Sequence, residues 1–194
     1  MNLPEEPQEL EDQFSSKKTS DVGGYAEEMV DHYWGSINYM SNLIRASEIK
    51  AGLILSFYGI LFNFIIENIK LVILKAPDHP FLYVLLVIWF IATVGSIFFS
   101  IRCFVPRLET KYDKNILFFG DVITKYGTIK EFSKTFYKIS LNEVELFDQL
   151  GQQIYVNSKI AALKFRLVNR SIKLLAFGLI MIFVIAISFF MVSK

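Results

Sequence analysis

Residues with covalent or metal-binding chemistry are scarce in this sequence. Its 194 residues include one cysteine, Cys103, and two histidines. A single cysteine excludes a disulfide within one chain, and no group of Cys and His has the spacing of a metal site. The sequence also lacks a glycine-rich phosphate loop. We therefore expect no enzymatic activity, no metal and no cofactor, and we assign Cys103 to apolar packing.

Charge is nearly absent from three long stretches of the chain. Hydrophobic residues make up 53% of the sequence, and 19 residues are phenylalanine, which is more than a soluble domain usually holds. The apolar residues gather at 52–74, 81–105 and 174–192. Each stretch reaches the roughly 20 residues that cross a bilayer. Within the bilayer no water can bond to the backbone N–H and C=O groups, so they must bond to one another, as they do in a helix. The sequence predicts an all-α integral membrane protein with three transmembrane helices.

Lys and Arg are distributed unevenly around these stretches. Arg45 and Lys50 precede the first, and residues 106–173 carry 12 basic against 7 acidic side chains. Cytoplasmic loops are enriched in Lys and Arg, so the N-terminus and residues 106–173 are expected in the cytoplasm and the C-terminus on the other side. The polar first 50 residues show no signal peptide. The basic loop also suits anionic headgroups or the acidic N-terminal arm, and the sequence leaves these alternatives open.

The polar regions differ in periodicity. Residues 1–24 are rich in Pro, Glu, Ser and Lys without a repeat, which predicts a disordered acidic arm. From residue 25, Met29, Tyr33 and Ile37 recur at helical spacing, so a cytoplasmic helix at 25–51 should continue into the first span. Ser140 and Glu143 form a predicted capping box for a second helix that runs into the last span. A small cytoplasmic helical bundle, continuous with spans one and three, is expected.

Several polar side chains on these two helices suit a small anion. They are Arg45, Glu48 and Lys50 on the first helix, and Gln152, Gln153, Asn157, Lys159, Lys164, Arg166 and Arg170 on the last. Cationic groups bind phosphate, and amides beside an aromatic face such as Tyr126 or Tyr155 suit a nucleobase. A solvated helix face with snorkelling cations is the alternative reading.

A stripe of small residues lies on the second span. Ala92, Ser96 and Ser100 recur at four-residue spacing. Small residues let transmembrane helices approach closely, so the stripe predicts an oligomer interface. Packing among the three helices of one chain explains the stripe equally well.

Short motifs along the chain resemble one family. Residues 47–51 (SEIKA) with Gly59, then 115–121 (NILFFGD), Glu131 with Phe132, and the helix at 149–165 follow one another. In this order they resemble the Pycsar effector family, of the PycTM transmembrane type, over about residues 30–192. The sequence departs from the family pattern at two positions: Glu48 stands where the family tends to have Asp, and Tyr58 where Asn is common.

The resemblance implies a function in antiviral, antiphage defence. A family member is expected to bind a cyclic pyrimidine nucleotide, cCMP or cUMP, made by a partner uridylate or cytidylate cyclase. It then impairs the integrity of the bacterial inner membrane, which causes abortive infection. The chain would be a multi-pass inner-membrane protein with a periplasmic C-terminus. Its partners would be lipid, the cyclic nucleotide and further copies of itself, without nucleic acid.

Seven residues are the predicted ligand contacts: Arg45, Glu48, Lys50, Gln153, Asn157, Lys164 and Arg166. Two other functions remain open. One is a constitutive membrane anchor or adaptor that recruits a protein partner without a small molecule. The other is an ungated holin-like toxin, although a cytoplasmic loop of this size favours gating.

Overall fold

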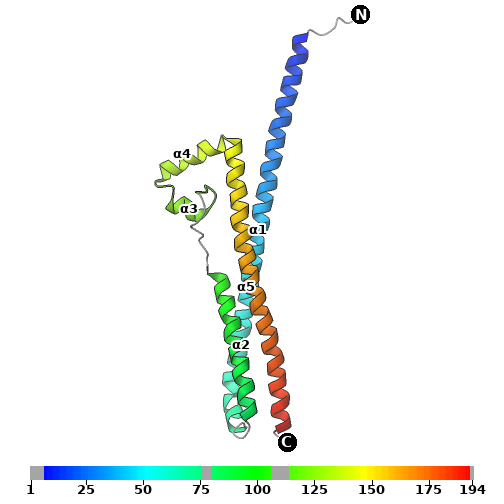
Figure 1. The fold of residues 1–194 in the computed structure, drawn as a ribbon, viewed down its shortest axis with the longest axis vertical. Helices are drawn as coiled ribbons and strands as arrows, with labels where there is room; N and C mark the ends of the chain where they lie inside the picture. Colours follow the sequence, from blue (N-terminus) through cyan, green and yellow to red (C-terminus); the bar gives the residue numbers. More distant parts are fainter. Residues whose placement is uncertain (1–6, 76–79, 106–113, 193–194) are drawn as a thin grey trace, which may run out of the picture. The chain divides into compact units, whose positions relative to one another are not determined.

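The computed structural model describes residues 7–75, 80–105 and 114–192. These ranges contain helices and no strand, so the predicted all-α class is confirmed (Figure 1). In chain order the helices are α1 (Pro7–Lys75), α2 (Pro80–Phe104), α3 (Phe119–Thr124), α4 (Ile129–Ser140) and α5 (Glu143–Val192).

Helix α1 is longer than the sequence predicts. It contains 69 residues and begins at Pro7, so residues 7–24 are helical and the predicted disordered arm is wrong for them. Proline is favoured at the first position of a helix, and the Gln, Glu and Leu residues that follow it are good helix formers. Residues 1–6 lie outside the described part of the chain. The predicted continuation of the 25–51 helix into the first apolar stretch is confirmed.

The chain divides into two compact units, and α1 and α5 each contribute to both. The head unit comprises Met1–Met40 and Glu109–Asn157, and the span unit comprises Ser41–Leu108 and Ser158–Lys194. The sequence predicted that the cytoplasmic segments end at residues 51 and 173, whereas the two units divide α1 after Met40 and α5 after Asn157.

The span unit combines parts of three apolar helices. By length and composition, α1, α2 and α5 each contain a segment able to cross a membrane. Their shared core contains Ala51, Ile54, Tyr58, Cys103, Leu167 and Val168. Cys103 is fully buried. Gly95 allows a close approach of α2 to α5, because a Cβ atom there would lie 3.1 Å from Leu174 Cδ1.

The start of helix α4 in the head unit is fixed by a capping box. The Thr128 side chain accepts from the Glu131 N–H, and the Glu131 side chain accepts from the Thr128 N–H, which makes a capping box at the start of α4. Gly127 precedes this box with a φ of +69°, in the left-handed region that favours glycine. The capping box stabilises the turn between α3 and α4.

The predicted capping box at Ser140 and Glu143 is wrong. Ser140 is the last residue of α4, and its hydroxyl donates to the Phe136 carbonyl at 2.8 Å. The cap of α5 is instead Asn142, whose Oδ1 accepts from the Glu145 N–H at 3.3 Å. The sequence offers two similar cap patterns, Ser140 with Glu143 and Asn142 with Glu145. Because Ser140 belongs to α4, only the second pattern caps α5.

Candidate functional site

The motif at residues 115–121 is a polar staple inside the head unit. Asn115 Nδ2 donates to the Gln149 carbonyl at 2.7 Å, and the Asn115 N–H donates to Asp121 Oδ2 at 3.0 Å. The Ile116 N–H donates to Gln149 Oε1 at 2.9 Å, and Asp121 also pairs with Lys125 at 2.8 Å. Buried polar groups that are paired in this way fix a single backbone arrangement. The staple therefore attaches the segment before α3 to α5.

Gln149 is the first of three amides that we call the amide row. Gln149, Gln153 and Asn157 follow at four-residue spacing on α5, and all three are buried. Gln153 Nε2 donates to Asn157 Oδ1 at 3.3 Å. Gln153 Oε1 is buried and has no hydrogen-bond partner among the described residues. An unsatisfied buried acceptor costs about 1–3 kcal/mol, so this oxygen is a candidate position for an N–H donor from a ligand.

The predicted aromatic faces differ in their surroundings. Tyr126 packs edge-on to Phe132 with ring centroids 5.7 Å apart, and Lys114 Nζ lies 5.5 Å from the Tyr126 ring centroid. Burial, and then the carboxylates of Asp121 and Glu145, raise the Tyr126 pKa above its ordinary value. Tyr126 is therefore an uncharged phenol at neutral pH, with one ring face next to a cation. Tyr155 is exposed on α5.

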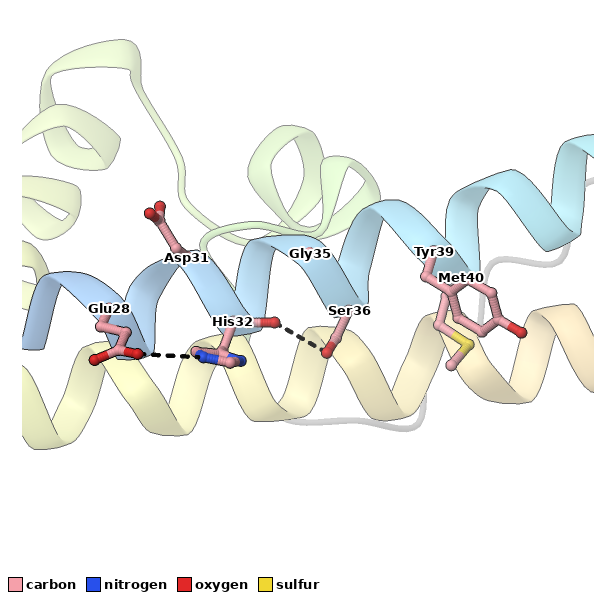
Figure 2. A pocket seen from close by; sticks show the side chains of 7 residues that line it. All are labelled: Glu28, Asp31, His32, Gly35, Ser36, Tyr39 and Met40. Atoms are coloured by element: carbon pink, nitrogen blue, oxygen red, sulfur yellow. Dashed lines mark hydrogen bonds and ion pairs between the residues drawn. The ribbon is translucent and has the colours of Figure 1, made fainter. Parts of the chain in front are cut away.

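Two open grooves lie in the head unit. One runs along α1, where Figure 2 shows Glu28, His32 and Ser36 succeeding one another on one side of the helix. The other lies between residues 26–31 of α1 and residues 140–147. Their volumes are about 520 and 500 Å³, but residues of α1 alone line the first, so it is an open helix face and not an enclosed ligand site.

The charge of both grooves is unfavourable for an anion. Glu28 and Asp31 line the first, Glu27, Asp31 and Glu143 line the second, and neither described lining includes Lys or Arg. Carboxylates repel a phosphate. The two grooves therefore do not supply the phosphate contact of a nucleotide site.

Two of the predicted ligand contacts pair with each other in the span unit. Lys164 is buried, and its Nζ donates to Glu48 Oε1 at 2.5 Å and to the Cys103 carbonyl at 2.7 Å. These three residues belong to α5, α1 and α2, so Lys164 ties the three helices together. A ligand at Glu48 or Lys164 would have to replace this clamp, and one partner would then stay buried without the other.

The remaining predicted cations are exposed. Arg45 and Lys50 are exposed on α1, and Arg166 is exposed on α5 with its Nε 3.4 Å from the Ala162 carbonyl. Arg170 lies 5.7 Å from the Phe99 ring centroid. Arg45, Lys50 and Arg166 thus stay predicted phosphate contacts. They belong to the span unit, whereas Gln153 and Asn157 belong to the head unit.

The small-residue stripe packs within the chain. Ala92, Ser96 and Ser100 are buried, and the Ser171 hydroxyl lies 3.0 Å from Ser96 Oγ and 2.7 Å from Ser100 Oγ. The structure therefore assigns the stripe to contacts between α2 and α5, the intrachain alternative. Its use as an oligomer interface would require this packing to open.

Sequence reasoning missed the staple and several buried polar atoms of the span unit. The two bonds of the staple to Gln149 join residues 34 and 33 positions apart, and only the motif at residues 115–121 indicated them. Tyr58, Thr93 and Trp89 lie in apolar stretches, and no pattern in the sequence indicated that their polar atoms would be buried without partners among the described residues.

Comparisons with known proteins agree with the motifs. A family model described as the Pycsar effector protein domain, PycTM, matches residues 32–192. The chain is also similar to the Pycsar effector protein PtPycTM of Propioniciclava tarda, at 25% identity over 79% of this chain and 76% of that protein. No solved structure matches it. The match covers most of the chain, including α2 to α5 and much of α1, and supports a role in antiphage defence. This protein belongs to the Pycsar effector family.

Proposed function

We propose that this chain is a non-enzymatic membrane effector of antiphage defence that binds a cyclic pyrimidine mononucleotide, cCMP or cUMP. A partner uridylate or cytidylate cyclase supplies the nucleotide, and binding leads to impairment of the bacterial inner membrane and to abortive infection. The observation that carries this proposal is the family match over residues 32–192, which includes all three helices able to cross a membrane.

The base end of the ligand is proposed to bind at the amide row. Gln153 Oε1 is an acceptor without a partner among the described residues. Uracil offers a ring N–H and cytosine an exocyclic amine, so either base has a donor for this oxygen. Gln149 already bonds within the staple, so Gln153 and Asn157 are the two amides proposed to recognise the base.

The membrane end of the proposal uses the apolar outer surface of the span unit. Large side chains such as Ile60, Phe90 and Phe183 are more than half exposed there. Lipid would cover them if α1, α2 and α5 cross the inner membrane, with the N-terminus and residues 106–173 in the cytoplasm and the C-terminus in the periplasm.

Two continuous helices offer a route from ligand to membrane. The 69 residues of α1 and the 50 residues of α5 each form one helix with residues in both units. A ligand that favours one packing of α1 and α5 in the head unit would bias the same helices in the span unit. Assembly of several copies is part of this proposal.

Equilibrium binding of radiolabelled cCMP and cUMP to the detergent-purified protein tests the proposal, with cAMP and cGMP as controls. We expect pyrimidine-selective binding. Gln153→Leu should weaken it about tenfold through loss of one hydrogen bond. Gln152→Leu is the matched control, because Gln152 is the preceding residue and pairs only with Asp148 among the described contacts.

The outcome separates the three functions. Binding of none of the four nucleotides would contradict the proposal and favour a constitutive anchor or adaptor. Growth arrest on expression alone, without phage or cyclase, would favour the ungated toxin. The exposed cations are tested in the same assay, since Arg45→Ala, Lys50→Ala and Arg166→Ala should each weaken binding if they contact the phosphate.

A further inference from the structure

The span unit encloses a row of hydroxyl groups in its core. We call Tyr58, Thr93, Ser96, Ser100 and Ser171 the hydroxyl row; each is at most 2% exposed. Ser171 is its centre. Its hydroxyl donates to the Ser96 carbonyl at 2.8 Å, and the Ser96 hydroxyl donates in return to the Ser171 carbonyl at 2.9 Å. Ser171 Oγ also lies 3.0 Å from Ser96 Oγ and 2.7 Å from Ser100 Oγ, so the three hydroxyl oxygens are close neighbours between α2 and α5.

Unpartnered polar atoms extend the row along α2. Tyr58 OH, Thr93 Oγ1 and Trp89 Nε1 are buried and form no hydrogen bond with the described residues. The Tyr58 hydroxyl lies beside the hydroxyls of Ser96 and Thr93, outside good hydrogen-bonding geometry. Phenylalanine and valine would fill the Tyr58 and Thr93 positions without a buried polar atom. Polar groups kept at such depth between transmembrane helices mark a pathway or a binding site.

The row and its end groups extend across much of a membrane. The hydroxyls of α2, from Thr93 to Ser100, cover about 11 Å of its length, and the 14 steps from Trp89 to Cys103 rise about 21 Å, against roughly 30 Å of hydrocarbon. At one end Lys164 binds Glu48 and the Cys103 carbonyl. At the other end Leu82 is buried two turns before Trp89. The polar row thus starts at an ion pair and stops at an apolar side chain.

We propose that the hydroxyl row is a proton path through the span unit of each chain. This inference rests on the proposed function, because it specifies how the effector impairs the membrane. Hydroxyl oxygens 2.7 to 3.0 Å apart leave no space for a hydrated metal ion. Each hydroxyl can accept a proton on one side and release its own proton on the other. The protons of Ser96 and Ser171 are bonded to carbonyls in this structure, so both hydroxyls turn toward their neighbours before transfer. After one proton has crossed, each hydroxyl rotates back before the next proton follows.

Adhesion between helices is the structural alternative. Serine hydroxyls hold transmembrane helices together, and this explains Ser96, Ser100 and Ser171. It does not explain Tyr58 and Thr93, whose hydroxyls make no such bond. The two explanations therefore differ most at these two residues. Leu82 is the buried apolar side chain beyond the end of the row, and ligand binding is expected to open the path by letting water past it.

Proteoliposomes that contain the full chain and a pH-sensitive dye test the path. A potassium diffusion potential drives protons inward, with and without cCMP and cUMP, and release of carboxyfluorescein is followed in parallel. The Tyr58→Phe/Thr93→Val double variant should lower proton flux about tenfold, equivalent to about 1.4 kcal/mol in the barrier. Its melting temperature should be unchanged or higher, and its nucleotide binding should be unchanged. Ser56→Ala is the control, because it removes an exposed hydroxyl from the same stretch of α1.

Three results would overturn the path: wild-type flux in the double variant, carboxyfluorescein release as fast as proton entry, or no proton flux in the wild type. Nucleotide binding is measured on the same preparation, so the two proposals fail separately. If the protein binds the nucleotide but the double variant has the same proton flux as the wild type, the path alone is rejected. If the protein binds no nucleotide, the proposed function is rejected. In that case a ligand-independent proton flux that the double variant lowers still supports the path.

Discussion

The staple of the head unit and the surroundings of Tyr58, Thr93 and Trp89 in the span unit treat buried polar groups differently. In the head unit the staple pairs Asn115, Asp121 and Gln149 with one another or with the backbone. In the span unit Tyr58, Thr93 and Trp89 bury polar atoms that lack hydrogen bonds to the described residues. Paired groups fix a shape, and unpaired groups lower stability unless something else uses them. This comparison separates residues that hold the fold from residues available for function.

The largest expected effect concerns the ion pair of the span unit. Glu48→Ala leaves the buried ammonium of Lys164 with only the Cys103 carbonyl, and should lower the free energy of unfolding by about 3 kcal/mol. Lys164→Met leaves a Glu48 side chain that is 36% exposed and can be hydrated, so it should cost only about 1 kcal/mol. Thermal unfolding in detergent measures the asymmetry. Equal losses would show that the pair acts as a surface ion pair.

The second prediction compares one paired and one unpaired buried group directly. Gln149→Leu removes the acceptor of the Ile116 N–H and should cost about 2 kcal/mol. Tyr58→Phe removes a hydroxyl without a hydrogen bond and should leave the melting temperature unchanged or raise it. A Tyr58→Phe protein as destabilised as Gln149→Leu would remove the distinction between the two units.

The third prediction concerns the glycine before α4. Gly127→Ala places a side chain at a φ of +69° and against the Glu131 carboxylate that caps the helix. The left-handed conformation alone costs about 1–2 kcal/mol. Gly35→Ala is the control in α1, where a Cβ meets nothing within 4 Å, and it should stabilise by about 0.5–1 kcal/mol. Chemical denaturation of both variants measures the free energies of unfolding. A Gly127→Ala protein as stable as the wild type would contradict the left-handed conformation at residue 127.

The smallest expected effect is a pH dependence of the α4 cap. The Thr128 N–H, and then the Thr128 hydroxyl, donate to the Glu131 carboxylate and lower its pKa from the ordinary 4.5. A lowered pKa stabilises the folded state above pH 4.5 and loses this contribution as pH falls through the lowered value. The stability difference between wild type and Glu131→Gln should be constant from pH 7 to about 5 and shrink below it. A difference independent of pH would contradict the cap.

Sequence predicted what depends on composition and local periodicity. The three apolar stretches and the continuation of α1 and α5 into them follow from runs of Phe, Leu and Ile, and the family was identified from short motifs. The Lys164 to Glu48 pair joins residues 116 positions apart, and the Ser96 to Ser171 contact joins residues 75 apart. Such contacts depend on how helices pack, which periodicity does not specify. The cap of α5 was misplaced because Ser140 and Asn142 offer similar local patterns.

Full burial of Cys103 makes the natural chain a ready background for site-directed labelling. The sequence contains no other thiol, and one enclosed in the helix core reacts slowly with maleimide or methanethiosulfonate reagents. A cysteine introduced at an exposed position such as Asn38 or Tyr155 would then carry a spin label selectively. Distance changes between two such labels on α1 and α5 would report ligand-driven motion without first removing a core residue.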